Sequence, residues 1–259
     1  VSRGLGDVYK RQTSFRLDTK HKNVYSKSVD NDIISGTVSD NGTVALITES
    51  SSYACSILVY DNTGKRIYQR NCVEYVVDIA FHKDNDGFCF TSVQVENGVM
   101  NSTITSVLFH QVDTQWTSMP LETMSVKSGF SSNDKLCVVG NTACAYYSST
   151  GEMLGTYNYN GTLVSADLEN GKAALIIQDD QKRNTSLVLL DQSVSSPKVI
   201  SIDSSAELVR VFDGDAIVMS PGNITSYAFS GDAIATVKLE GAYTSFLKQD
   251  LSLIHISEP

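Results

Sequence analysis

Short runs of β-branched, aliphatic and aromatic residues alternate with polar turns along most of this chain, and the pattern is clearest over residues 33–70. Four such runs are separated there by Asp40-Asn-Gly42, a serine-rich stretch and Asn62-Thr-Gly64. Val, Ile, Tyr and Thr favour a pleated, half-buried strand, and Asn-Gly supplies the positive φ that a tight hairpin needs. The stretch therefore predicts a four-stranded antiparallel meander of about 40 residues.

The same four-strand pattern recurs down the chain. The turn after the first strand of each unit returns at intervals of about 45, 47, 37 and 44 residues, counted through Gly42, Gly87, Asp134, Gly171 and Asp215. A period of about 40–45 residues with four strands per unit is typical of a β-propeller, whose units, or blades, pack face to face. A sandwich would show frequent turns without this repetition. We therefore predict an all-β propeller of four-stranded antiparallel blades, with about five blades and partial ones visible in an incomplete ring.

We expect the propeller to occupy residues 13–250. Its blades are predicted near residues 33–71, 74–120, 124–158, 161–203 and 206–240, with the start of another at 243. Residues 1–12 and 251–259 resemble translated sequencing-adapter read-through, and we interpret both ends as non-native and exclude them from the fold. On this interpretation the natural protein continues on both sides, where an anchor, further blades or the functional site would lie.

Composition and charge narrow the possible partners. Hydrophobic residues at 41% and charged residues at 19% are ordinary for a globular chain. The formal net charge is −9 and no cluster of Lys and Arg occurs, so nucleic acid and anionic lipid are disfavoured as partners. Simple solubility is favoured over an acidic binding face as the explanation of the acidic balance. No apolar run reaches about 18 residues, so no part of the given sequence is expected to span a membrane.

The five cysteines contain no C-x-x-C pair. A two-residue turn at Gly140-Asn141 would place Cys137 opposite Cys144 as a hydrogen-bonded cross-strand pair, a geometry that suits a disulfide poorly. Buried thiols that act as small hydrophobic side chains are the favoured explanation. The cysteine count does not fix the cellular compartment.

The blades resemble those of WD40-like and quinoprotein-like propellers, because a strand, an Asp-Asn-Gly turn and a second strand lead to Val59-Tyr-Asp-Asn-Thr-Gly64. The chain most resembles an uncharacterised clostridial family that carries a domain of unknown function, DUF5711, over Phe15–Asp18, Ile33–Gln69 and looser repeats to about Leu247. The resemblance implies a membrane-anchor helix in the full-length protein and an extracytoplasmic propeller at the surface of a Gram-positive bacterium; a cytoplasmic location is the alternative. Trp116 is the only tryptophan, so binding of a quinone cofactor is not expected.

No motif for metal, phosphate or nucleophilic chemistry stands out. The stretch from His82 to Gly87 resembles a calcium loop, but its twelfth position would be Val93, where a carboxylate is required. There is no G-x-S-x-G and no phosphate-binding glycine loop. His82 and Cys89 flank one hairpin and form the first Cys–His pair to inspect. We expect no metal and no cofactor.

The favoured hypothesis is a non-catalytic recognition or scaffold propeller for a protein or cell-envelope ligand, with its oligomeric state left open. Its variable rim would be the loops 49–54, 94–103 and 178–185, and the last of these carries the only locally basic tip, Lys182 and Arg183. The alternative is a propeller enzyme of hydrolase or lyase type with a site on the central axis. First-strand positions line a propeller channel, so the candidate residues for that site are Asp78, His82 and Asp167.

Overall fold

The computed structural model describes residues 13–18, 23–111, 113–179, 181, 183–241, 243–249 and 252–256. These residues form five four-stranded and two two-stranded antiparallel sheets. None of them belongs to a helix long and apolar enough to cross a membrane. The chain divides into two units, residues 1–121 and 122–259.

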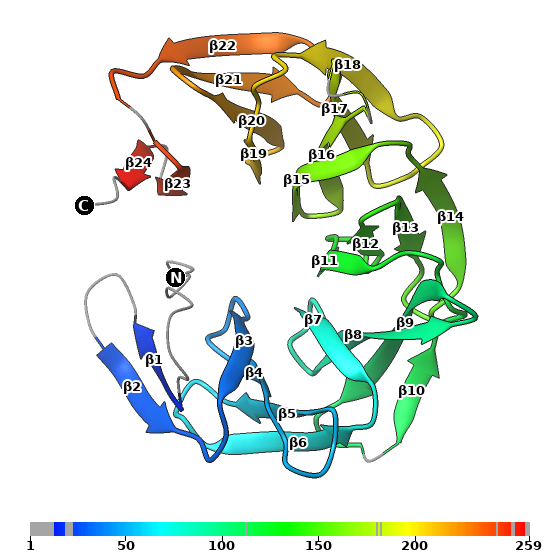
Figure 1. Cartoon of the computed structure of the whole chain (residues 1–259). Coiled ribbons are helices and arrows are strands. Elements are labelled where there is room, and N and C mark those ends of the chain that lie inside the picture. Colours follow the sequence, from blue (N-terminus) through cyan, green and yellow to red (C-terminus); the bar gives the residue numbers. More distant parts are fainter. Residues whose placement is uncertain are drawn as a thin grey trace. The chain divides into compact units, whose positions relative to one another are not determined.

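The first unit holds a two-stranded sheet and two four-stranded sheets, which we call blades (Figure 1). The two-stranded sheet pairs β1 (Ser14–Asp18) with β2 (Asn23–Ser28). The strands of the two blades are β3 (Ile33–Val38), β4 (Val44–Thr48), β5 (Cys55–Tyr60) and β6 (Arg66–Cys72), then β7 (Tyr75–Phe81), β8 (Gly87–Glu96), β9 (Val99–Leu108) and β10 (Thr114–Thr117).

The second unit holds three blades and a final two-stranded sheet. The blades are formed by β11 (Ser125–Phe130), β12 (Leu136–Gly140), β13 (Ala143–Tyr147) and β14 (Met153–Asn158); β15 (Thr162–Glu169), β16 (Lys172–Gln178), β17 (Thr185–Asp191) and β18 (Lys198–Ile202); and β19 (Leu208–Phe212), β20 (Asp215–Ser220), β21 (Asn223–Ala228) and β22 (Ala233–Lys238). The last sheet pairs β23 (Ser245–Gln249) with β24 (Ser252–Ile256).

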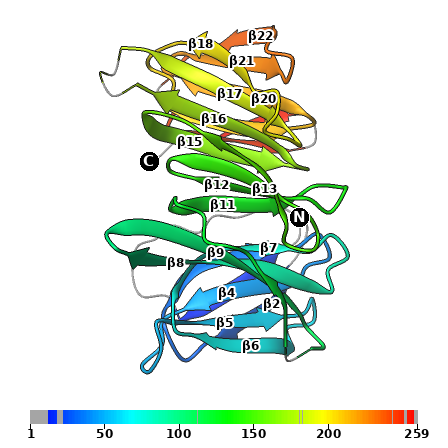
Figure 2. The ribbon, with the colours of Figure 1, turned by 90° about the vertical axis from the view of Figure 1, so that its right-hand side faces the viewer.

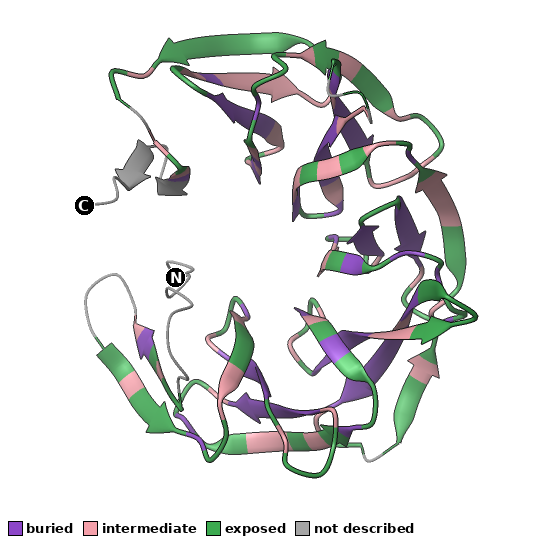
Figure 3. Ribbon diagram, viewed as in Figure 1, coloured by how far each residue is buried: buried purple, intermediate pink, exposed green. Residues whose placement is uncertain are grey.

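Every blade is an up-and-down meander in which each strand pairs with the next one in sequence. The two central strands are the buried ones: β12 and β13 are buried at every residue, whereas the last strand β22 is exposed at every residue (Figure 3). A strand that is covered on both faces has a continuous apolar sequence and not an alternation of apolar and polar residues. The all-β class and the four-stranded antiparallel blade are therefore confirmed.

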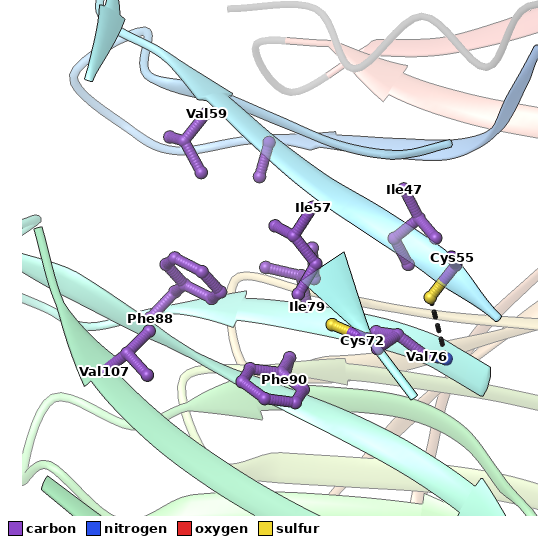
Figure 4. Close-up of a cluster of buried hydrophobic side chains, with 11 residues drawn as sticks. Ile47, Cys55, Ile57, Val59, Cys72, Val76, Ile79, Phe88, Phe90 and Val107 are labelled. Atoms are coloured by element: carbon purple, nitrogen blue, oxygen red, sulfur yellow. Dashed lines mark hydrogen bonds between the residues drawn. The ribbon is translucent and has the colours of Figure 1, made fainter. Parts of the chain in front are cut away.

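The hydrophobic cores lie between blades, because the blades of each unit stack face to face (Figure 2). In the first unit Ile57 and Val59 of β5 meet Phe88 and Phe90 of β8 in one buried cluster (Figure 4). Two corresponding clusters in the second unit join the β11–β14 blade to the β15–β18 blade, and that blade to β19–β22. Each blade therefore depends on its neighbour for its core.

Left-handed backbone closes the first hairpin of each blade. Gly42 does so in the first blade with a φ of 85°. The turn between β11 and β12 has no glycine, and Asp134 adopts a φ of 55° there, because Asp tolerates this region better than most residues. In the β7–β8 hairpin Asn85 takes this role. Gly87 instead opens β8 at a point where a Cβ atom would collide with the carbonyl oxygen of Val107.

The predicted register of Cys137 and Cys144 is wrong. Val139 pairs with Cys144 and Cys137 pairs with Tyr146, so the two loop residues are Asn141 and Thr142 instead of Gly140 and Asn141. The two cysteines are diagonal neighbours on one face, with their Sγ atoms 3.7 Å apart. Both are buried free thiols, and the hydrogen bond with the Cys137 thiol, together with burial, raises the pKa of Cys144 well above its usual range.

The first strands of the three blades in the second unit are joined by polar side chains. The carboxylate of Asp167 on β15 forms an ion pair with Lys127 of β11, and it accepts a hydrogen bond of 2.9 Å from the backbone N–H of Val211 on β19. Ser165, also on β15, accepts a bond of 3.1 Å from the N–H of Val209. Side chains of β15 thus connect this strand to both β11 and β19.

We expect Asp167→Ala to lower the free energy of unfolding by about 2–3 kcal/mol, because it leaves the buried N–H of Val211 without its acceptor and Lys127 without its counter-ion. Asp167→Asn, which keeps an acceptor, should cost about 1 kcal/mol. Urea denaturation followed by circular dichroism measures both values. The exposed Glu207 provides the control, and Glu207→Gln should stay within about 0.5 kcal/mol of the parent. Equal stability of Asp167→Ala and the parent would contradict this role.

Candidate functional site

Two of the residues predicted to line a channel, Asp78 and His82, lie in the first hairpin of the β7–β10 blade. Asp78 is half-buried on β7, opposite Thr91. His82 directly follows β7, and its Nδ1 lies 3.2 Å from Oδ1 of Asp86 while its Nε2 lies 3.0 Å from Oγ of Ser106 on β9. The imidazole is therefore held between its own turn and the third strand of the blade.

The contacts of His82 follow the order carboxylate, imidazole, hydroxyl, which is also the order in a hydrolytic triad. Ser106 is only 1% exposed, and its hydroxyl donates a bond of 2.9 Å to Oε1 of Gln115 on β10. A nucleophilic hydroxyl has to face the substrate and give its proton to the base. This arrangement accordingly suits the cross-linking of three strands better than acyl transfer.

The structure also brings together the Cys–His pair of this hairpin. Sγ of Cys89 lies 3.9 Å from Nε2 of His82. Cys89 is 1% exposed, and burial raises the pKa of its thiol to about 12. Because the thiolate is the nucleophilic form of cysteine, burial works against a catalytic role for this pair at neutral pH.

Asp167, the third predicted channel residue, belongs to the second unit. It is buried, and the ion pair with Lys127 and the bond from Val211 occupy both of its carboxylate oxygens. These bonds give Asp167 a structural use between neighbouring first strands. A role in a channel stays a prediction for Asp78, His82 and Asp167.

The predicted basic loop tip falls only partly within the described residues, because Lys182 lies outside them. Arg183 is exposed, and its backbone N–H donates a bond of 2.8 Å to the carboxylate of Asp179. That bond, together with those from Asn184, lowers the pKa of Asp179. The Asp179 carboxylate thus stabilises the β16–β17 loop through hydrogen bonds from residues of that loop.

Cys55 and Cys72 form a thiol pair that sequence reasoning missed, since they lie 17 positions apart in the sequence and belong to no familiar motif. They are directly opposite each other on β5 and β6, and both are buried. The N–H of Val76 approaches Sγ of Cys55 at 3.5 Å (Figure 4). A hydrogen bond from the Cys72 thiol lowers the pKa of Cys55, and the same interaction raises the pKa of Cys72.

A cleft of about 310 Å³ opens between the β3–β6 blade and the β7–β10 blade of the first unit, and we call it the Arg70 cleft. One wall is the end of β6 and the segment that connects it to β7. The other wall is the face of β8, β9 and β10. Its lining residues are Arg70, Asn71, Cys72, Val73, Glu74, Phe90, Ser92, Gln94, Thr103, Thr105, Thr114 and Thr117.

Arg70 is the only cation that lines this cleft. It is half-buried on β6, its guanidinium lies over the ring of Phe90 at 5.2 Å from the centroid, and Nη1 donates a long bond of 3.5 Å to Oγ1 of Thr114. Stacking on an aromatic ring fixes the plane of a guanidinium and leaves its edge available for hydrogen bonds. The cleft therefore contains a positioned, planar cation.

Exposed apolar side chains occur at one end of the β7–β10 blade, on both faces of the β8–β9 tip, because Val95 pairs with Met100 on one face and Val99 pairs with Glu96 on the other. The strands β8 and β9 run beyond their neighbours, because β7 begins only at Tyr75, opposite Val93, and the tip turns at Asn97 and Gly98. Met119 is at the same end, since Leu121 pairs with Ser102. We call this set of exposed side chains the apolar rim; its residues are Val73, Tyr75, Val95, Val99, Met100 and Met119.

The predicted long loop 94–103 is therefore wrong as a loop. Most of it is strand, with a two-residue turn at Asn97 and Gly98. The polar run Asn101-Ser-Thr103 hid the strand, because no alternation of apolar and polar residues marks it. In the described part of the chain, no group of three or more His, Cys, Asp or Glu residues is placed to hold a metal ion.

Solved structures similar to this one share its fold at low sequence identity. The WD40 domain of Neurospora crassa Pan2 has a TM-score of 0.60 at 14% identity, over 89% of this chain and 74% of that chain. BamB from Moraxella catarrhalis has a TM-score of 0.53 at 11% identity, over 96% and 89%. A functionally unknown protein from Desulfotomaculum acetoxidans has a TM-score of 0.60 at 10% identity, over 88% and 77%. These likenesses concern the fold alone, and they confirm the predicted β-propeller.

No curated protein matches the chain. A family model does match it, over residues 9–256. The match enters residues 9–12 and 251–256, which the sequence led us to interpret as non-native; that interpretation stays a prediction. Since the match covers nearly the whole length, the chain belongs to the family of unknown function DUF5711.

Proposed function

We propose that this chain is a non-catalytic recognition propeller that binds a protein partner through the apolar rim, at the outer cell surface. The rim itself is the observation that carries the proposal. Met119 is 78% exposed, Val73 74% and Tyr75 66%, and they lie at the same end of the β7–β10 blade or in the segment that leads into it. Clustered large apolar side chains on a surface are typical of protein-interaction sites.

Two further observations support recognition over catalysis. The similar structures include WD40 domains, a fold whose loops and strand ends commonly present binding surfaces. The polar candidates for chemistry are bonded inside the fold: His82 to Asp86 and Ser106, and Asp167 to Lys127 and Val211. The outer-surface location rests on the implication of the family resemblance.

Cross-linking in the native host tests the rim. A benzophenone side chain at Met119 or Val95 should give a discrete protein adduct, and the control at Ile234, an apolar position on β22 that is also exposed (55%), should give none. Val73→Asp combined with Tyr75→Asp should reduce the adduct about tenfold or more, with stability within about 0.5 kcal/mol of the parent because both side chains are exposed. Equal adducts from the rim and from Ile234 would contradict the proposal.

Thiol labelling tests the location. All five native cysteines are buried, so a membrane-impermeant maleimide should leave the parent chain unlabelled and should label Met119→Cys in intact cells. Purified Met119→Cys should take up one equivalent, which shows that the new thiol is accessible. Labelling that appears only after cell lysis would place the chain inside the cell.

A further inference from the structure

The Arg70 cleft offers a cation without a carboxylate partner. The chain has 29 Asp and Glu residues against 20 Lys and Arg, yet within the described ranges no carboxylate forms an ion pair with Arg70. A guanidinium has five N–H donors, and the long bond to Thr114 uses only one of them. The remaining donors of this half-buried group are available to a ligand in the cleft.

The charges of the cleft favour a single carboxylate. The planar fork of arginine binds carboxylates and phosphates in a bidentate manner. Glu74, exposed at the same cleft, balances the charge of Arg70, so the cleft has no excess positive charge to offset the larger desolvation cost of a phosphate dianion. With one cation and one acidic neighbour, a monoanionic group fits best.

The uncharged part of the lining favours a peptide. Seven hydroxyl and amide side chains line the cleft: Asn71, Ser92, Gln94, Thr103, Thr105, Thr114 and Thr117. They offer both donors and acceptors, as backbone amides of a peptide require. A sugar ring or a nucleobase would use an open aromatic face, but Phe90 is only 4% exposed and lies beneath the Arg70 guanidinium.

The cleft is also continuous with the apolar rim, because Val73 lines the cleft and belongs to the rim. Val99 extends this continuity on the second wall: it pairs with Glu96, two residues beyond Gln94, and therefore lies on the same face of the β8–β9 hairpin as that lining residue. A peptide bound in the cleft would therefore extend out of it across the exposed aliphatic side chains of Val73 and Val99.

We infer that the Arg70 cleft binds a peptide segment of the partner that carries one Asp or Glu side chain or a C-terminal carboxylate, with adjacent apolar residues on the rim. The carboxylate pairs with the Arg70 guanidinium, the backbone of the segment bonds to the hydroxyl and amide lining, and its apolar residues contact Val73 and Val99. This inference rests on the proposed function and specifies the chemistry of the partner.

A displayed library of random decapeptides, panned on the purified chain, tests it. Selected peptides should share one acidic residue or an essential C-terminal carboxylate. By fluorescence anisotropy, neutralising that group should weaken binding about tenfold or more. Arg70→Met should weaken binding equally, and the two changes together should cost little more than either alone, because they remove the same pair. Arg70→Lys should fall between Arg70→Met and the parent.

Matched variants guard against misfolding. Arg66→Met removes an exposed arginine from the same strand and should leave binding unchanged. Thr105→Val keeps the volume of a lining residue and should weaken binding about threefold through a lost hydrogen bond. The denaturation midpoint of Arg70→Lys should match that of the parent, which separates lost recognition from lost structure.

The outcomes separate this inference from the proposed function. Peptides whose binding ignores Arg70→Met but is lost in Val73→Asp would overturn the inference and leave rim recognition intact. A failure to select any peptide overturns the inference, and it overturns the proposed function only if rim cross-links are also absent. Stronger competition by inorganic phosphate than by acetate would overturn the preference for a carboxylate, and Arg70-dependent binding of tetragalacturonate in place of peptides would assign the cleft to acidic carbohydrate.

Discussion

Face-to-face packing of four-stranded sheets is the constraint on which this molecule depends. A blade has two apolar faces, and the described residues form no helix that could cover them, so its central strands are stable only between neighbours. The buried clusters joining β5 to β8 in the first unit, and β16 to its neighbours in the second, satisfy that need. Edges and connections remain outside these cores. Function is therefore expected at strand ends and between blades, where the Arg70 cleft and the apolar rim lie.

The polar groups of the molecule divide between holding the fold and meeting solvent. Asp167 contacts Lys127 and Val211 within the second unit. His82 contacts Asp86 and Ser106 within the first unit. Arg70 differs, because its aromatic neighbour orients the guanidinium without neutralising it. A cation that is fixed but not neutralised is suited to recognition, since the ligand then meets it with little loss of side-chain freedom.

Strand order and blade composition could be predicted from the sequence because they depend on local signals: β-branched runs, Asn-Gly turns and their period. Local signals failed where one residue of loop length decided the outcome, as at Cys137 and Cys144, whose register differs by one turn position. They also failed for the β8–β9 tip, where polar residues continue a strand. The Arg70 cleft was beyond prediction, because its walls come from two blades and its central contact joins Arg70 to Phe90 across the interface between them.

The bonds between first strands of the second unit have a consequence for sequence divergence. Asp167 and Ser165 both accept hydrogen bonds from main-chain N–H groups of β19. Every residue except proline has such a donor. The side chains of β19 can therefore be replaced during evolution while these hydrogen bonds to β15 are kept. A fold assembled in this way tolerates near-complete replacement of its sequence, in keeping with identities of only 10–14% to propellers that retain its architecture.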